Sequence, residues 1–196
     1  MKAFTLIAVA ALAGTAVAGP ITGRGADTSR GWTSRVAPVD LVFDVSGVDS
    51  WDTFGSPNND VFSINIGANS HVIGIGWDVD ISTVGASWLS EATVDFTDSA
   101  ITTGVSLTVG IGDDFSGSSN YNSGGVFDLT TIPLDFVVGA DGILRLEFWE
   151  GFDDAANAID ANWLRGALTI RYEPVPAPAS VALLGLGGLV AGRRRR

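Results

Sequence analysis

The sequence predicts an all-β protein, an antiparallel β-sandwich of about nine strands that lies between two apolar terminal segments. Apolar and polar residues alternate with a period of two along most of the body, as in half-buried strands. Clusters of Gly, Ser, Asn and Asp separate the alternating runs, and no convincing amphipathic helix lies between them. One polar face per strand favours antiparallel sheets, and both jelly-roll and immunoglobulin-like topologies fit this pattern.

The first alternating run covers residues 39–45, where the odd positions are apolar and Asp40 and Asp44 take the opposite face. Runs of the same kind follow along the chain at residues 61–66, 71–79, 87–96, 104–111, 142–149 and 166–172. Two shorter candidate strands cover residues 126–129 and 134–138, and residues 152–163 could hold one helical turn.

Two of these runs predict which side chains face solvent. In residues 87–96 we expect Trp88 in the core and Asp95 on the wet face. In residues 142–149 we expect Arg145 and Glu147 on the wet face, opposite the leucines.

The N-terminus has the pattern of a secretory signal peptide, residues 1–18. Lys2 precedes a short apolar stretch, and the small residues Ala16 and Ala18 stand at the −3 and −1 positions before Gly19. A membrane anchor would need about 20 apolar residues. We therefore expect signal peptidase to cleave after Ala18 and the body to be exported.

Net charge and cysteine content limit the partners that the body could bind and the ways in which its fold could be stabilised. Without Lys2 and the four terminal arginines, six basic residues face 22 acidic ones, a net charge of −16. This charge argues against nucleic acid as a partner. The absence of cysteine means that a packed core must hold the exported body without disulfides. We expect one domain over residues 38–173, preceded by an irregular segment over residues 19–37.

Residues 174–196 form a tripartite tail of prolines, an apolar run and four arginines. A helix from Pro178 to Gly192 would rise about 22 Å, a short membrane span. The positive-inside rule places Arg193, Arg194, Arg195 and Arg196 in the cytoplasm and therefore the body outside. The two ends thus predict the same topology.

This tail resembles the PEP-CTERM sorting signal, which an exosortase processes in Gram-negative bacteria and which is also labelled an ice-binding protein C-terminal domain. The resemblance covers about 22 of the 196 residues. The matching motif consists of Val175, Pro176, Ala177, Pro178, Ala179 and Ser180. Ala177 replaces the family's usual acidic residue, which points to a variant enzyme or to a retained anchor. The resemblance implies transient anchoring in the inner membrane, transfer to the surface or exterior, and association with exopolysaccharide or biofilm matrix.

Few side chains in the body suggest catalysis. The mature body has no lysine and a single histidine, His71, which shares the parity of inward residues in its strand. We interpret His71 as a core-edge histidine rather than a triad member. A zinc site would need more His or Cys ligands. A carboxylate pair of the glycosidase type stays an alternative, because acidic residues are plentiful.

Two weak ligand hypotheses remain. Calcium is the one candidate cofactor, since it binds carboxylates, although no EF-hand loop is present. The calcium candidates are Asp78, Asp80, Asp113, Asp114, Asp153 and Asp154. Carbohydrate binding could use exposed aromatics, and the candidates are Trp149, on a predicted wet face, and Tyr121, in a predicted loop.

From these observations we expect a non-enzymatic, exported structural or adhesive protein of the envelope or extracellular matrix. Its partners would be signal peptidase, an exosortase-type transpeptidase and exopolysaccharide. The alternative is a carbohydrate-binding module that could depend on calcium.

Overall fold

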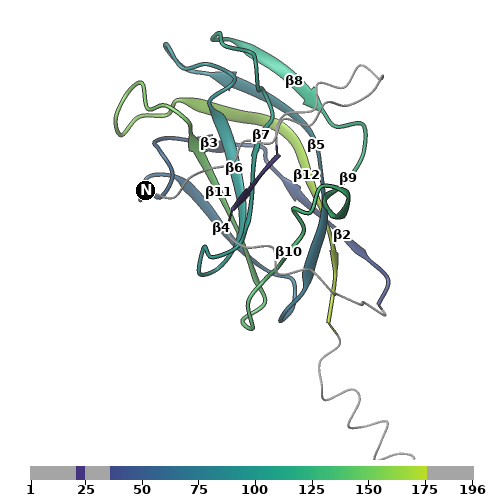
Figure 1. The fold of residues 1–196 in the computed structure, drawn as a ribbon. Coiled ribbons are helices and arrows are strands. Elements are labelled where there is room, and N and C mark those ends of the chain that lie inside the picture. Colours follow the sequence, from purple (N-terminus) through teal and green to yellow (C-terminus); the bar gives the residue numbers. More distant parts are fainter. Residues whose placement is uncertain (1–20, 25–35, 176–196) are drawn as a thin grey trace, which may run out of the picture.

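The computed structural model describes residues 21–24 and 36–175, and these confirm the all-β prediction. Two antiparallel sheets face each other around a single hydrophobic core (Figure 1). The signal peptide, the motif from Pro176 onward and the arginine cluster lie outside the described residues. Within the described ranges, no helix is long and apolar enough to cross a membrane.

Sheet A has the strand order β1-β7-β6-β11-β4, with every neighbouring pair antiparallel. Its strands are β1 (Ile21–Arg24), β4 (Asp60–Asn65), β6 (Ala92–Asp98), β7 (Gly104–Thr108) and β11 (Ile143–Glu150). Residues 21–24 thus form an edge strand, although the sequence suggested an irregular segment there.

Sheet B is built on two long strands, β5 (His71–Thr83) and β12 (Ala161–Glu173), which pair along most of their length. On the far side of β12 lie β2 (Val39–Asp44) and β3 (Val48–Ser50). On the far side of β5 lie β8 (Ser118–Asn122), β9 (Phe127–Asp128) and β10 (Phe136–Val137). The 3₁₀ turn η1 (Leu129–Thr131) follows β9.

The described residues contain twelve strands, three more than expected. The strands without a counterpart in the sequence prediction are β1, β3 and β8. The sequence of β8, SSNYN, has a single apolar residue, so its alternation gave no signal. The suggested helical turn within residues 152–163 is not present; β12 begins at Ala161 instead.

The core lies between the sheets and follows the predicted parity in most strands. In β5 the side chains of Ile75, Val79 and Ile81 are buried, and in β11 those of Leu144, Leu146 and Phe148 are fully buried. The Trp163 ring meets Phe148 edge-on at 5.0 Å between centroids, which joins the two sheets.

Candidate functional site

Three loops meet at one end of the sandwich, and together they carry six acidic side chains. The loops are residues 84–91 between β5 and β6, residues 109–117 between β7 and β8, and residues 151–160 between β11 and β12. We call this surface the loop end.

Backbone hydrogen bonds join the three loops directly. Leu89 N donates to the carbonyl of Phe115 at 3.0 Å, which connects the first loop to the second. Gly151 N donates to the carbonyl of Glu91 at 2.9 Å, which connects the third loop to the first. The loop end is therefore one continuous surface rather than three separate turns.

Four of the six predicted calcium candidates lie at the loop end. Asp113 and Asp114 come from its second loop, and Asp153 and Asp154 come from its third. The other two candidates lie elsewhere. Asp78 and Asp80 lie on β5 and pair across to β8, where Asn120 Nδ2 donates to Asp80 Oδ1 at 2.7 Å, and Asp80 also pairs with Arg165.

Asp113 and Asp114 of the second loop both accept hydrogen bonds from other parts of the protein. Asp113 accepts a 2.8 Å hydrogen bond from the Tyr121 hydroxyl. Burial raises the pKa of Tyr121, and this hydrogen bond adds to the shift. Asp114 accepts a 2.8 Å hydrogen bond from Ser90 Oγ, between the second and first loops. These two carboxylates therefore brace the loops.

Sequence analysis missed the most unusual carboxylate of the loop end, Glu150. It is the last residue of β11 and its exposed fraction is 0%. Neither of its carboxylate oxygens has a hydrogen-bond partner. Burial raises its pKa to about 9, and the negative charge of Asp160 adds to the shift. Ser50 opposes the shift but stays outside hydrogen-bond geometry.

Two further acids share this environment. Asp160 is 1% exposed and accepts a 3.3 Å hydrogen bond from Asp154 N. Burial is also the main cause that raises the pKa values of Asp160 and Glu91, and neighbouring carboxylates add to both shifts. Glu91 accepts a 2.8 Å hydrogen bond from Trp88 N. The loop end therefore holds three neighbouring carboxyl groups, Glu91, Glu150 and Asp160, in which burial disfavours the charged form.

Large apolar side chains stand exposed at the same end. The exposed fractions are 45% for Trp88, 55% for Phe115 and 61% for Phe152. The expectation that Trp88 lies in the core is wrong, because the run from residue 87 starts with a turn and strand β6 begins only at Ala92. Leu89 is the buried residue of that turn.

Of the two predicted carbohydrate candidates, Tyr121 does not lie as expected. Tyr121 is not in a loop but in β8, with 6% of its surface exposed. Trp149 is half-buried; its Nε1 donates to Asp95 Oδ1 at 2.9 Å and its ring meets Phe54 edge-on. Tyr121 therefore offers no open ring face for sugar stacking, whereas Trp149 keeps part of its surface exposed.

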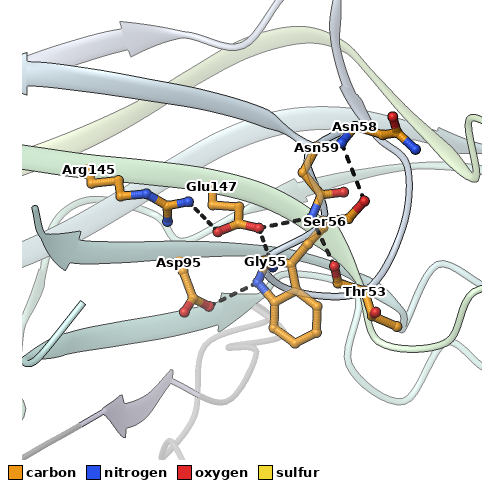
Figure 2. Close-up of polar contacts among 9 residues, drawn as sticks. Thr53, Gly55, Ser56, Asn58, Asn59, Asp95, Arg145 and Glu147 are labelled. Atoms are coloured by element: carbon orange, nitrogen blue, oxygen red, sulfur yellow. Dashed lines mark hydrogen bonds and ion pairs between the residues drawn. The ribbon is translucent and has the colours of Figure 1, made fainter. Parts of the chain in front are cut away.

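A second polar cluster lies on the outer face of sheet A, beneath the loop of residues 51–59 (Figure 2). Glu147 accepts hydrogen bonds from Gly55 N at 2.6 Å, Asn59 Nδ2 at 2.9 Å and Arg145 at 2.6 Å. It is fully buried, as is Asp95, which lies opposite it on β6. The predicted wet faces of β6 and β11 are therefore wrong here, because this loop binds over Glu147 and Trp149 contacts Asp95.

The Asp95 and Glu147 pair does not resemble a catalytic carboxylate pair. Both side chains have an exposed fraction of 0%, and the donors described above occupy both oxygens of Glu147. His71 is likewise buried and lies 2.7 Å from Asp135 through Nε2, as expected for a core-edge histidine. Among the described residues, no group of three or more His, Asp or Glu side chains could hold a metal ion.

Comparisons with known proteins give no family. No protein-family model matches the chain, and no curated protein matches it. Among solved structures, the VP2 subviral particle of infectious bursal disease virus is 17% identical with a TM-score of 0.37. That match covers 85% of this chain and 37% of the viral one. The structure of tomato aspermy virus is 12% identical with a TM-score of 0.24, over 75% of this chain and 83% of the other. Likenesses at this level do not establish a shared fold or function.

Proposed function

We propose that this chain is an exported β-sandwich protein that is sorted to the cell surface and serves as a structural or adhesive component of the envelope or extracellular matrix. The observation that carries the proposal is the agreement of the two ends, a signal peptide ending at Ala18 and a tripartite tail ending in four arginines. In this proposal an exosortase-type enzyme processes the tail.

The position of β12 is compatible with this processing. The strand ends at Glu173, three residues before Pro176, and the described core lies entirely upstream. Cleavage near the proline motif would therefore remove none of the twelve described strands. The released sandwich would keep its strong negative charge and remain soluble.

The test is the intact mass of the protein from its native host, measured separately in the envelope and in the culture supernatant. We expect a species that begins at Gly19 and ends near residues 176–180. A species in both fractions that keeps Arg193 to Arg196 would contradict sorting and leave the tail as a plain anchor. An Ala177→Glu variant, which restores the usual acidic residue, is the matched control and should be processed at least as completely.

The alternative is a carbohydrate-binding module, and the exposed aromatics of the loop end favour it. Trp88, Phe115 and Phe152 supply ring faces beside carboxylates, a combination suited to sugar stacking and hydroxyl recognition. Pull-down on the host's own exopolysaccharide, with a Trp88→Ser and Phe152→Ser double variant as control, tests it. Equal retention of the variant and the native protein would exclude the loop end as a glycan site.

A further inference from the structure

Strand β4 lies at one edge of sheet A, and β11 is the one described strand that pairs with it. Ile66 N donates to the carbonyl of Gly142 at 2.9 Å, on the side of β11. Consecutive residues of a strand direct their N–H and C=O groups to opposite sides, so Val61, Ser63 and Asn65 direct theirs to the open edge. The open edge therefore offers three pairs of backbone donors and acceptors to another strand.

The side chains of β4 permit the close approach of a second strand. Val61, Ser63 and Asn65 are exposed on the outer face of sheet A, and none of them carries a charge. On the inner face, Phe62 and Ile64 pack against the core but are only partly buried. A strand laid along β4 would cover more of these two apolar side chains. An exposed and uncharged edge of this kind is a template for pairing with another chain.

The neighbouring edge strand, β2 of sheet B, is protected in a way that β4 is not. The rings of Phe43 in β2 and Phe62 in β4 lie 4.9 Å apart between centroids, so the two edges lie on the same side of the sandwich. In β2, Asp40 and Asp44 stand on either side of the exposed Val42. Charged side chains are a common protection of free edges against pairing. Pairing on this side of the sandwich is therefore favoured at β4.

We infer that β4 pairs antiparallel with β4 of a second copy of this chain, about a two-fold axis at Ser63. In this register Ser63 faces its own copy, and Val61 faces Asn65 of the second copy. Each backbone N–H and C=O group of the open edge then has a partner, and no like charges meet along the strand. The contact uses the same surface on both copies, so it closes as a dimer with one sheet continuous through both sandwiches.

Charge favours a second copy over other partners at this edge. The net charge of −16 on the body repels anionic surfaces. A cationic peptide would be drawn to carboxylates, as on β2 or the loop end, and not to an uncharged strand. Repulsion between two acidic copies is spread over their surfaces and is screened by salt, so the dimer should become tighter as ionic strength rises. The inference rests on the geometry of sheet A and not on the sorting of the tail.

The first experiment is disulfide cross-linking of the full chain in detergent, where every thiol is an introduced one because the sequence has no cysteine. Opposed residues in a hydrogen-bonded antiparallel pair have Cα atoms about 5.5 Å apart, within the range of about 4.4–6.8 Å that a disulfide spans. With oxidised glutathione, Ser63→Cys should form a covalent dimer. Val42→Cys, at an exposed position of β2, is the matched control and should stay monomeric. Equal cross-linking of the two variants, or none in Ser63→Cys, would overturn the inference.

A mixture of two further variants tests the register. In the inferred pairing, Val61 and its own copy lie about 13 Å apart along the strands, too far for a disulfide, and the same holds for Asn65. Val61→Cys and Asn65→Cys should therefore stay monomeric alone and form a covalent dimer when they are mixed. Strong cross-linking of Val61→Cys to itself would contradict the antiparallel register.

Sedimentation velocity tests the pairing without a covalent bond. The native chain should form a dimer whose dissociation constant falls as sodium chloride rises from about 0.05 to about 0.5 M. Ser63→Lys places like charges opposite each other, so it should shift the chain to monomer while keeping the native circular dichroism spectrum. Val42→Lys should leave the dimer intact. A dimer that persists in Ser63→Lys would assign the contact to another surface and refute the inference. The mass measurement on the tail is a separate readout, so either proposal can fail alone.

Discussion

Replacing Glu147 by alanine should strongly destabilise the sandwich, because this side chain ties sheet A to the loop of residues 51–59 (Figure 2). The substitution removes three hydrogen bonds, at 2.6 Å from Gly55 N, 2.9 Å from Asn59 and 2.6 Å from Arg145. Hydrogen bonds to a charged group contribute about 1.5–3 kcal/mol each, but bonds that share one acceptor group are not additive.

The expected loss of stability in Glu147→Ala is estimated from what happens to Arg145. Its side chain is only 15% exposed and lies over the Phe54 ring at 5.9 Å, so without Glu147 it becomes a poorly solvated, unpaired charge. Removing one partner of a buried ion pair costs about 3–5 kcal/mol. We expect Glu147→Ala to lower the free energy of unfolding by this amount.

The assay is urea unfolding followed by tryptophan fluorescence, with Glu147→Gln as the matched variant. Glutamine keeps one acceptor oxygen for Gly55 N and Asn59 but loses the charge, so it should cost less than alanine. A loss below about 1 kcal/mol for Glu147→Ala would refute the reasoning, since it would mean that the 51–59 loop does not depend on this carboxylate.

Three further predictions concern other described contacts. Trp149→Phe should lower the free energy of unfolding by about 1.5–3 kcal/mol in the same urea assay, because it removes the hydrogen bond to the buried Asp95. Trp88→Phe, at an exposed site, should change it by no more than about 0.5 kcal/mol. Equal losses in the two variants would contradict this prediction. Gly166→Ala in β12 should cost about 2–4 kcal/mol, because φ there is +107° and a Cβ would overlap the carbonyl oxygen of Asp78; a Tm like that of the native protein would disprove it. The Ser56 hydroxyl, aided by Asn157 N and Asn58, holds the pKa of Asp52 below its ordinary value, so this carboxylate stabilises the fold at neutral pH and its contribution disappears as pH falls below about 4. Asp52→Asn should therefore unfold at a lower Tm than the native protein at pH 7, with a difference that shrinks at pH 3; a difference that grows in acid would reverse the assigned sign.

Strands with a strong apolar alternation could be predicted from the sequence, and strands with a polar composition could not. Residues 71–79 and 142–149 alternate clearly and correspond to parts of β5 and β11. The polar strand β8 lies beside β5 through backbone pairing, with Tyr121 as its one buried side chain. Period-two analysis detects which side chains are buried, and a strand held mainly by its backbone gives little such signal.

The candidate site illustrates a different limit. Asp113 and Asp153 could be proposed from their loop-like surroundings, since local composition marks turns. Glu150 could not be proposed in this way. Its sequence neighbours do not indicate that strand β11 ends beneath loops that bury its last side chain. Likewise, Glu147 follows the parity of a wet face, and only the loop of residues 51–59, about 90 residues earlier, makes that face buried.

The place of β12 in sheet B determines how the sandwich would bear mechanical load. Residues 167–172 of β12 pair with β2 on one side, and the same stretch pairs with β5 on the other, up to the last residue of the strand at Glu173. Ladder hydrogen bonds run perpendicular to the strands. A pull on the chain beyond Glu173 along the strand axis would load both ladders together in shear instead of unzipping them one bond at a time. If the tail tethers the protein to a membrane or a matrix, the tether is attached to a strand that resists extraction on both edges.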